Sequence, residues 1–425
     1  MQPRYLGIVT AGVAAMLAST LSGCGQSEAA GSGDATIKLV AAEYGDRSGN
    51  SSKRYWDQLA GEFEFKHPGI SVDVDVYTWK EVDKKVAAMV KAGHAPDIAQ
   101  IGSYADYAAQ NKLYRADEML SIPTQAGFIP ALADAGKVRR IQYGLPFVAS
   151  TRVLFYNKDL FAKAGLSGPP KTWDELASDA EALERAGVKT PYALPLGPEE
   201  PQAETLNWML SGGAYHDDIG SYTIDSPQNI RTFTWLRDAL VGEGLTNRDP
   251  GSMNRQDAFD AFTRGDAAML NGHPTLMQLA QENGIDFGMA PLPGRNGRSK
   301  ATTGVADWMM AFRQNGHREE IGTFLDFVYS KRNVLKFADQ YDLLPVTTDA
   351  SEAMRADENN KAVWKFLDEL PTARSYPVGK RSWSAVAARL KSEIGDAVTK
   401  DGDPASVLGS LQREAETTEN AASSS

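Results

Sequence analysis

The side chains that could carry out covalent chemistry are few, and they do not form a known reactive arrangement. The chain of 425 residues has one cysteine and five scattered histidines: His67, His94, His216, His273 and His317. Glu199 and Glu200 could serve a glycosidase only from opposite sides of a cleft, which is a poor geometry for sequence neighbours. The chain lacks Gly-x-Ser-x-Gly, Gly-Lys-Ser/Thr and His-Glu-x-x-His motifs. We therefore predict no enzyme, no metal and no cofactor.

The single cysteine, Cys24, lies where a lipid anchor would be attached. Residues 5–21 are apolar or small and uncharged, and Arg4 precedes them, which is typical of an export signal. Leu21-Ser22-Gly23-Cys24 resembles the lipobox of bacterial lipoproteins, in which the signal is cut before an acylated cysteine. We predict a signal peptide over residues 1–23 and lipidation at Cys24.

The segments at the two ends of the body have compositions that do not favour a packed fold. Residues 25–34 (GQSEAAGSGD) are rich in Gly and Ser, so we predict a flexible tether over residues 24–35. The last residues, ETTENAASSS, lack an apolar stripe, and we predict a disordered tail over residues 415–425. The net charge of −11 argues against nucleic-acid binding.

Hydrophobic periodicity predicts two sets of alternating strands and helices in the body. The first set comprises strands at 35–40, 70–76 and 97–101 with helices at 52–66, 79–93 and 104–111. The second has strands at 152–157, 191–196 and 267–270, and helices at 172–186, from 226, and at 255–264. Helices at 319–329, 334–341, 361–370, 383–398 and 404–414 follow. Such alternation predicts an α/β fold, and the length predicts two domains.

Five segments, in order along the chain, resemble the bacterial extracellular solute-binding proteins that serve carbohydrate ABC importers, a family related to maltose-binding protein. These segments are FEFKHPGISVDVDV (63–76), APDIAQIGSYADYAAQNKL (95–113), GLPFVASTRVLFYNKDLFAKAGLSGPPKTWDEL (144–176), FTRGDAAMLNG (262–272) and FADQYDLLPV (337–346). The third is the most specific, and the resemblance covers residues 36 to 414.

The resemblance implies a two-lobed periplasmic-binding-protein-like fold of type II, with a mostly parallel sheet in each lobe and a multi-strand hinge. We expect an N-terminal lobe of residues 36–149 and 309–345 and a C-terminal lobe of residues 151–307 and 347–414. The chain should cross between the lobes near 149–151, 307–310 and 344–346. The ligand should then lie between the lobes, at the ends of strands.

A sugar site needs carboxylate, amide or guanidinium groups for paired hydroxyls and a flat ring for the apolar face. The resemblance and the strand ends together select these candidates: Glu43, Tyr44, Asp46, Gly102, Ser103, Tyr104, Ser150, Glu200, Trp208, Gly272, His273, Gly304, Asp307, Trp308, Arg381 and Trp383. His273 stands where the family often has an aromatic residue, which puts stacking there in doubt. Core packing is the alternative for Tyr104 and Trp208.

The resemblance implies an extracytoplasmic, lipid-anchored and monomeric receptor. Such a receptor captures a sugar or oligosaccharide by hinge closure and presents it to a membrane permease served by an ATPase. A receptor for a polyamine or a peptide remains an alternative, as does a secreted carbohydrate-active enzyme.

Overall fold

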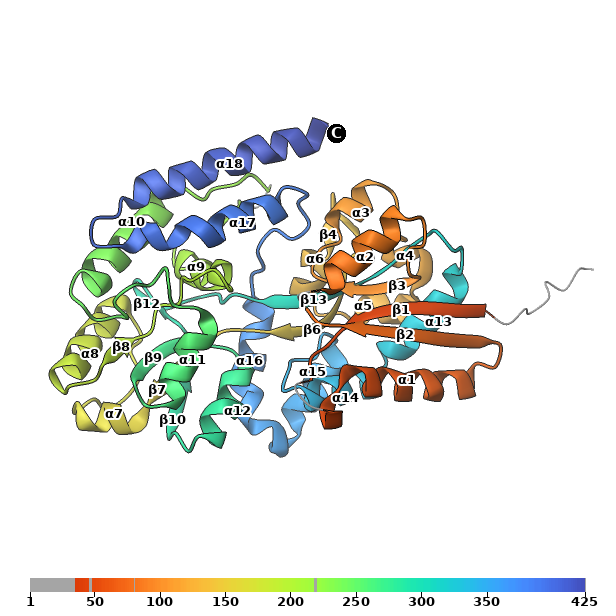
Figure 1. Ribbon diagram of the computed structural model, residues 1–425. Helices are drawn as coiled ribbons and strands as arrows, with labels where there is room; N and C mark the ends of the chain where they lie inside the picture. Colours follow the sequence, from red (N-terminus) through yellow and green to blue (C-terminus); the bar gives the residue numbers. More distant parts are fainter. Residues whose placement is uncertain (1–34, 46–47, 80, 218–219, 425) are drawn as a thin grey trace, which may run out of the picture.

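The structure, a computed structural model, describes residues 35–45, 48–79, 81–217 and 220–424 (Figure 1). The predicted signal peptide, Cys24, the tether up to residue 34, and Asp46 lie outside these residues. The chain is built around two sheets that lie side by side, each flanked by helices. We call the sheet containing β1, with its helices, the N-terminal lobe and the sheet containing β7, with its helices, the C-terminal lobe.

The N-terminal lobe is organised by a five-stranded sheet of order β2-β1-β3-β13-β6. Its strands are β1 (Ala35–Ala42), β2 (Ile70–Tyr77), β3 (Ile98–Ile101), β6 (Leu145–Ser150) and β13 (Val305–Ala311). Strand β1 pairs in parallel with β2 and β3, whereas β13 pairs antiparallel with β3 and β6. The sheet is therefore mixed rather than mostly parallel, because β13 enters this lobe where β6 leaves it.

Helices on both faces of this sheet bury the apolar stripes that the sequence predicts. They are α1 (Ser52–Lys66), α2 (Val82–Lys91), α3 (Ala105–Ala109), α4 (Ala116–Met119), α5 (Ile122–Gly127), α6 (Pro130–Ala135), α13 (Arg318–Val328) and α14 (Lys331–Gln340). The first begins after Ser51, whose hydroxyl accepts from the Lys53 N–H, and it buries Trp56, Leu59 and Phe63 as predicted.

A four-stranded sheet of order β10-β7-β9-β8 organises the C-terminal lobe. Its strands are β7 (Val153–Asn157), β8 (Thr190–Tyr192), β9 (Ala267–Gly272) and β10 (Phe287–Ala290). Only the β8–β9 pair is parallel, so this sheet is also mixed. Two short hairpins, β4 (Lys137–Val138) with β5 (Ile141–Gln142) and β11 (Pro293–Gly294) with β12 (Gly297–Arg298), lie outside the two main sheets.

The helices of the C-terminal lobe are α7 (Lys158–Lys163), α8 (Trp173–Arg185), α9 (Pro201–Met209), α10 (Pro227–Trp235), α11 (Arg255–Thr263), α12 (Pro274–Glu282), α17 (Trp383–Glu393) and α18 (Pro404–Ser424). Some of them, including α7, α8 and α10, begin after a residue whose side chain caps them. Thr172 caps α8 by accepting from the Glu175 N–H at 3.1 Å, which confirms the predicted start. None of the described helices is both long and apolar enough to cross a membrane.

The chain passes between the lobes at segments that lie against one another. Strand β6 leads through Thr151 and Arg152 into β7, and Ala149 exchanges two backbone hydrogen bonds with Leu344. The predicted crossing at 307–310 falls within β13, which begins at Val305 and pairs with β3 and β6, and the domain bounds drawn from the sequence stay predictions. Helices α15 (Thr348–Ala356) and α16 (Trp364–Glu369) follow, and the Phe366 carbonyl accepts from the Thr151 hydroxyl at 2.9 Å.

The carboxyl-terminal segment differs from the prediction of a disordered tail over residues 415–425. Helix α18 continues to Ser424, and its end extends toward the N-terminal lobe (Figure 1). Ala415 is fully buried, and the Glu419 carboxylate accepts hydrogen bonds from Lys380 and Ser382. The segment lacks an apolar stripe of its own, and these polar contacts to other parts of the lobe hold it in place.

Candidate functional site

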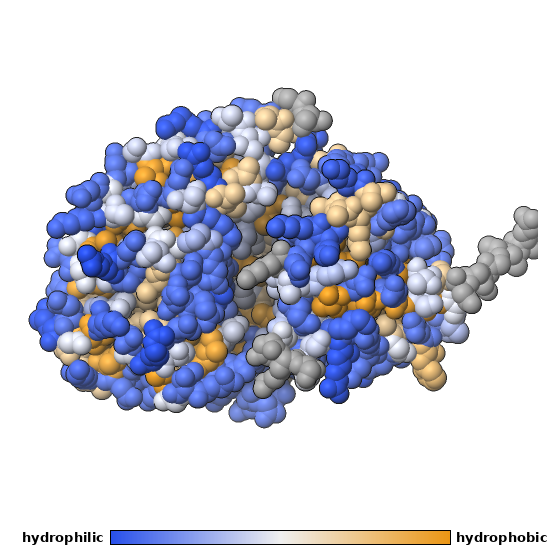
Figure 2. All heavy atoms as spheres, in the orientation of Figure 1, coloured by the Kyte–Doolittle hydropathy of each residue, from blue (hydrophilic) through white to orange (hydrophobic). Residues whose placement is uncertain are grey.

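A cavity of about 1230 Å³ lies between the two lobes. Figure 2 shows the surface hollowed between the two halves of the molecule. The N-terminal lobe contributes α3, α6 and the β4–β5 hairpin, and the C-terminal lobe contributes the end of α9 and the loop after it. Residues 373–381, which precede α17, complete the wall together with Glu419 and Ala422 of α18. A solute in this cavity would touch both lobes and the carboxyl-terminal helix.

Aromatic rings form part of the C-terminal wall. Tyr215 and Tyr376 line the cavity, and Trp383 lies behind them with 7% of its surface exposed. The Tyr376 and Trp383 rings stack at 5.5 Å with an interplanar angle of 18°, and Tyr215 lies 5.2 Å from Trp383. The predicted tryptophan therefore supports the ring of Tyr376 and does not itself line the cavity. No local pattern in the sequence distinguishes Tyr376 from other tyrosines.

Arg381 is the one sequence-predicted residue, among those described, that lines the cavity. Its Nε donates to Asp106 Oδ1 at 3.1 Å, and its Nη1 donates to the Ala422 carbonyl at 2.6 Å. Asp106 lies on α3 of the N-terminal lobe, so this side chain links the two lobes and α18. The contact would break if the lobes moved apart at this edge.

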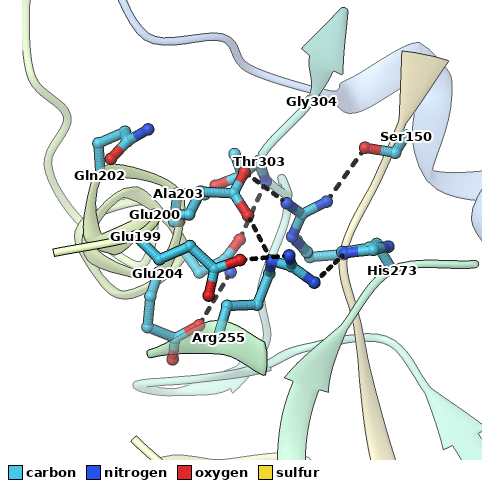
Figure 3. A network of polar contacts seen from close by, with 12 residues as sticks. Ser150, Glu199, Glu200, Gln202, Ala203, Glu204, Arg255, His273, Thr303 and Gly304 are labelled. Carbon is cyan, nitrogen blue, oxygen red and sulfur yellow. Dashed lines mark hydrogen bonds and ion pairs between the residues drawn. The ribbon is translucent and has the colours of Figure 1, made fainter. Parts of the chain in front are cut away.

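Beside the hinge, acidic and basic side chains form a network in which Glu199, Glu200, Arg255 and His273 converge (Figure 3). Glu200 accepts from Arg152 Nη2 at 2.9 Å and lies 3.3 Å from Arg255 Nε. Arg255 also binds Glu199, and its Nη1 lies 3.3 Å from His273 Nε2. Arg152 is 5% exposed and additionally donates to Ser150 Oγ at 3.1 Å. Neither arginine is among the site residues predicted from the sequence, although Arg152 directly follows the predicted first crossing.

Burial, together with the charges of this network, favours the neutral form of His273. Burial lowers the pKa of His273 well below its usual value, and the positive charges of Arg152 and Arg255 lower it further. A neutral imidazole can accept the Arg255 hydrogen bond through Nε2. This ring also contacts Phe259 at 4.9 Å, so His273 holds the guanidinium in place and is not a stacking platform.

A second polar group at the hinge comes from the N-terminal lobe. The Tyr44 hydroxyl donates to Asp307 Oδ2 at 2.6 Å and accepts from the Gln100 amide. Burial raises the pKa of Asp307 to about 6; the hydrogen bond from Tyr44 offsets part of that rise, and the negative charge of Glu200 adds to it. Asp307 of the N-terminal lobe and Glu200 of the C-terminal lobe, both of which are predicted from the sequence, therefore interact electrostatically.

Several other predicted residues have structural roles. Glu43 accepts from the Gly45 and Ser52 N–H groups and from the Ser51 hydroxyl. Partial burial alone would raise the pKa of Glu43, but these hydrogen bonds outweigh it and lower that pKa. The Gly102 N–H donates to Asp83, and Ser103 is exposed. None of these residues lines the cavity.

The remaining aromatic and glycine candidates are packed into the interior. Tyr104 is fully buried with its ring 5.3 Å from that of Trp308, which is itself 2% exposed. Trp208 is 4% exposed and donates to Glu204 at 2.8 Å. A Cβ on Gly272 would lie 2.7 Å from Phe155, and one on Gly304 would lie 2.7 Å from Ala373. Their placement supports core packing and not ligand contact.

Comparisons with known proteins show which family of proteins this chain is similar to. A family model described as "Bacterial extracellular solute-binding protein" matches residues 49–335. A protein of Brucella abortus (strain 2308) that carries the name "Putative binding protein" is 28% identical over 400 residues, 92% of this chain and 95% of that protein. The sn-glycerol-3-phosphate-binding periplasmic protein UgpB of Salmonella typhimurium is 28% identical over 328 residues, 70% of this chain and 72% of that protein.

The fold is also similar to that of solved structures. The cyclic alpha-maltosyl-1,6-maltose binding protein of Arthrobacter globiformis superposes with a TM-score of 0.76 at 18% identity. The alignment covers 92% of this chain and 99% of that protein. The α/β, two-lobed fold of type II that the sequence predicts is thereby confirmed, with mixed sheets.

Proposed function

We propose that this chain, which belongs to the bacterial extracellular solute-binding proteins, is the receptor of an ABC importer and captures a sugar or oligosaccharide between its lobes. Relatives named for cyclic alpha-maltosyl-1,6-maltose and for sn-glycerol-3-phosphate share a polyhydroxylated solute, which is the class we infer here. The receptor delivers its solute to a permease in the membrane, and a cytoplasmic ATPase drives import.

The single observation that carries this proposal is the composition of the interlobe cavity. Three tyrosines, Tyr143 of the N-terminal lobe and Tyr215 and Tyr376 of the C-terminal lobe, line it beside charged side chains from both lobes. Aromatic faces cover the C–H faces of sugar rings, and charged groups pair with hydroxyls. The volume of about 1230 Å³ exceeds the roughly 300–1,000 Å³ of ordinary small-molecule sites, which favours an oligosaccharide or an extended solute.

Hinge closure is the proposed mechanism of capture. The crossing segments at Thr151 and Arg152 and at the start of β13 join the lobes, and the Arg381–Asp106 pair forms a further contact between them. A solute that contacts both lobes binds the closed form more tightly and shifts the population toward it. The permease would then recognise the closed form.

The anchoring of the receptor is part of the proposal. Acylation at Cys24, after removal of residues 1–23, would hold a monomer on the outer face of the cell membrane by a tether. Mass spectrometry of the purified full chain tests this: the mature amino terminus should be Cys24 carrying acyl chains, and a Cys24→Ala variant should lack them.

A thermal-shift screen of mono- and oligosaccharides tests the function itself. A ligand at 100 times its Kd stabilises a protein by about 2.7 kcal/mol. A Tyr376→Ala variant should lose most of the response, because it removes a ring that lines the cavity. Trp364→Ala, at a residue that does not line the cavity, serves as a control for general destabilisation. A response to amines or peptides alone would refute the sugar-like class.

A secreted carbohydrate-active enzyme is the alternative that the site disfavours. Glu199 and Glu200 are adjacent in one loop and both bind Arg255, so they do not face each other across a bond. Incubation with oligosaccharides should therefore yield no new reducing ends.

A further inference from the structure

The charge of the cavity lining is opposite in sign to that of the whole chain. Five cationic residues line the cavity against two carboxylates, whereas the chain carries a net charge of −11. The cations are Lys137, Arg139, Arg374, Lys380 and Arg381, and the acids are Asp134 and Glu419. A concave surface that carries charge of one sign concentrates solutes of the opposite charge.

Both carboxylates of the cavity lining already have partners within the protein. Asp134 pairs with Lys137, and Glu419 accepts from Lys380 at 2.8 Å and from Ser382. Arg381 is neutralised by Asp106 of the N-terminal lobe. This leaves Arg139 and Arg374, for whose guanidinium groups no hydrogen bond or ion pair is found within the described part of the chain. The field of Glu419 reaches Arg139, but both oxygens of this carboxylate already have donors.

The backbone at Arg139 adds a second, independent observation. Arg139 and Arg140 form the two-residue turn between β4 and β5, with φ of 50° and 70°. A turn of this type requires positive φ at both positions and therefore favours Asn-Gly or Asp-Gly. Arginine is unfavourable there, and non-glycine residues held in the left-handed region cluster at ligand-binding sites. The turn thus places the charged side chain of Arg139 at the cavity, although arginine is unfavourable at this backbone conformation.

Arg374 is fixed in place by its backbone. Its N–H donates to the Thr302 carbonyl, and its carbonyl accepts from the Gly304 N–H, both at 2.9 Å. These bonds tie it to the residues that lead into β13, at the hinge. The guanidinium is exposed at the cavity wall on a rigid support, which lowers the cost of ordering it on a ligand.

We infer that the solute carries an anionic group, a phosphate or a carboxylate on a sugar or polyol, and that Arg139 and Arg374 bind this group. This inference rests on the proposed function and narrows it from neutral saccharides to acidic ones. Planar guanidinium groups suit both anions because they donate two parallel hydrogen bonds. It also argues against a polyamine, which the same charges would repel.

Isothermal titration calorimetry of the whole protein at 20 and 200 mM NaCl tests the inference. The probes are sn-glycerol 3-phosphate, glucose 6-phosphate, glucuronate, inorganic phosphate, glucose and maltose. We expect an anionic sugar or polyol to bind, with weaker binding at the higher salt concentration. Arg139→Gln and Arg374→Gln should each raise its Kd about tenfold or more. Arg140→Gln is the matched control, since Arg140 belongs to the same turn but does not line the cavity.

An Arg139→Asn variant separates binding from folding. Asparagine tolerates positive φ, so this variant should melt at a higher temperature than the wild type and yet bind the anionic probe more weakly. A purely structural turn would give the higher melting temperature with unchanged binding, which would overturn the role of Arg139.

The probe series distinguishes failure of this inference from failure of the proposed function. Binding of glucose or maltose alone, unaffected by the two glutamine variants, would overturn the anionic class and leave a sugar receptor. If inorganic phosphate binds as tightly as the phosphate esters of sugars and polyols, the sugar or polyol moiety does not contribute to recognition, and that part of the inference is overturned. A response to amines or peptides alone would overturn both proposals.

Discussion

Glu204 provides a sharp test of the electrostatics beside the cavity. This carboxylate is 5% exposed and lies on α9, the helix that contributes Leu206 to the cavity wall. It accepts from Trp208 Nε1 at 2.8 Å, Asn271 Nδ2 at 3.0 Å and the Tyr192 hydroxyl at 3.2 Å. All of these donors are neutral, so no cation compensates for the loss of hydration of a buried charge.

The raised pKa of Glu204 sets how much the free energy of unfolding depends on pH. Burial raises its pKa from 4.5 to about 7, and the hydrogen bonds, led by that from Trp208, offset part of the rise. Each unit is worth about 1.36 kcal/mol, so the shift corresponds to about 3 kcal/mol of folding free energy. Below pH 4.5 both the folded and the unfolded chain hold the proton, and this stabilisation is complete. It falls as the pH rises from 4.5 to about 7, because only the folded chain keeps the proton, and it is absent above that range.

Glu204→Gln should remove this pH dependence, because glutamine is a neutral isostere of the protonated acid. Urea unfolding at pH 4.5, 6, 7 and 8 would measure it. We expect the variant to lie within about 1 kcal/mol of the wild type at pH 4.5 and to be more stable by up to about 3 kcal/mol at pH 8. Glu352→Gln, an exposed change on α15, should follow the wild type at every pH. If Glu204→Gln is less stable than the wild type at pH 8, Glu204 is stabilised as a carboxylate and the reasoning is wrong.

Two further predictions concern contacts at the edge of the cavity. Asp106→Asn removes the partly exposed pair with Arg381, worth about 0.2–1 kcal/mol, so stopped-flow dissociation of a bound solute should accelerate by up to about fivefold. Asp57→Asn, which breaks a surface pair within the N-terminal lobe, should leave that rate unchanged, and equal rates in both variants would exclude the interlobe role of Arg381. Glu419→Gln weakens the bond to Lys380 and should speed amide hydrogen exchange in the lining segment before α17, while exchange in α1 stays constant. Unchanged exchange in that segment would show that α18 does not support the cavity wall.

Local signals in the sequence predict the helices well. The spacing of Trp56, Leu59 and Phe63, together with the Pro68-Gly69 stop, predicts residues 52–66, and α1 has these bounds. The Thr172 cap likewise predicts the start of α8. These signals act between residues that are close in sequence, so one chain contains all the information needed to find them.

Features that depend on distant partners could not be predicted in the same way. The direction of β13 is set by its pairing with β3 and β6, more than 150 residues away along the chain. The last turns of α18 look polar in isolation, yet Glu419 is fixed by Lys380 and Ser382. A composition rule for disorder counts apolar residues and cannot include polar contacts to another segment.

The candidate site was predicted least well, because residue type and strand-end position do not reveal whether a side chain already has partners. Glu200, Ser150 and His273 lie beside the hinge, but each already contacts Arg152 or Arg255, and none of them lines the cavity. No pattern in the sequence marks Arg139 or Arg374 as a site residue. Within the described residues, their guanidinium groups have no hydrogen bond or ion pair. A side chain that already has partners gains little from a ligand, whereas a guanidinium at a cavity wall without a partner gains most when a ligand supplies one. We therefore expect the hinge network to have a structural role. Arg139 and Arg374 at the cavity wall should determine which solutes bind.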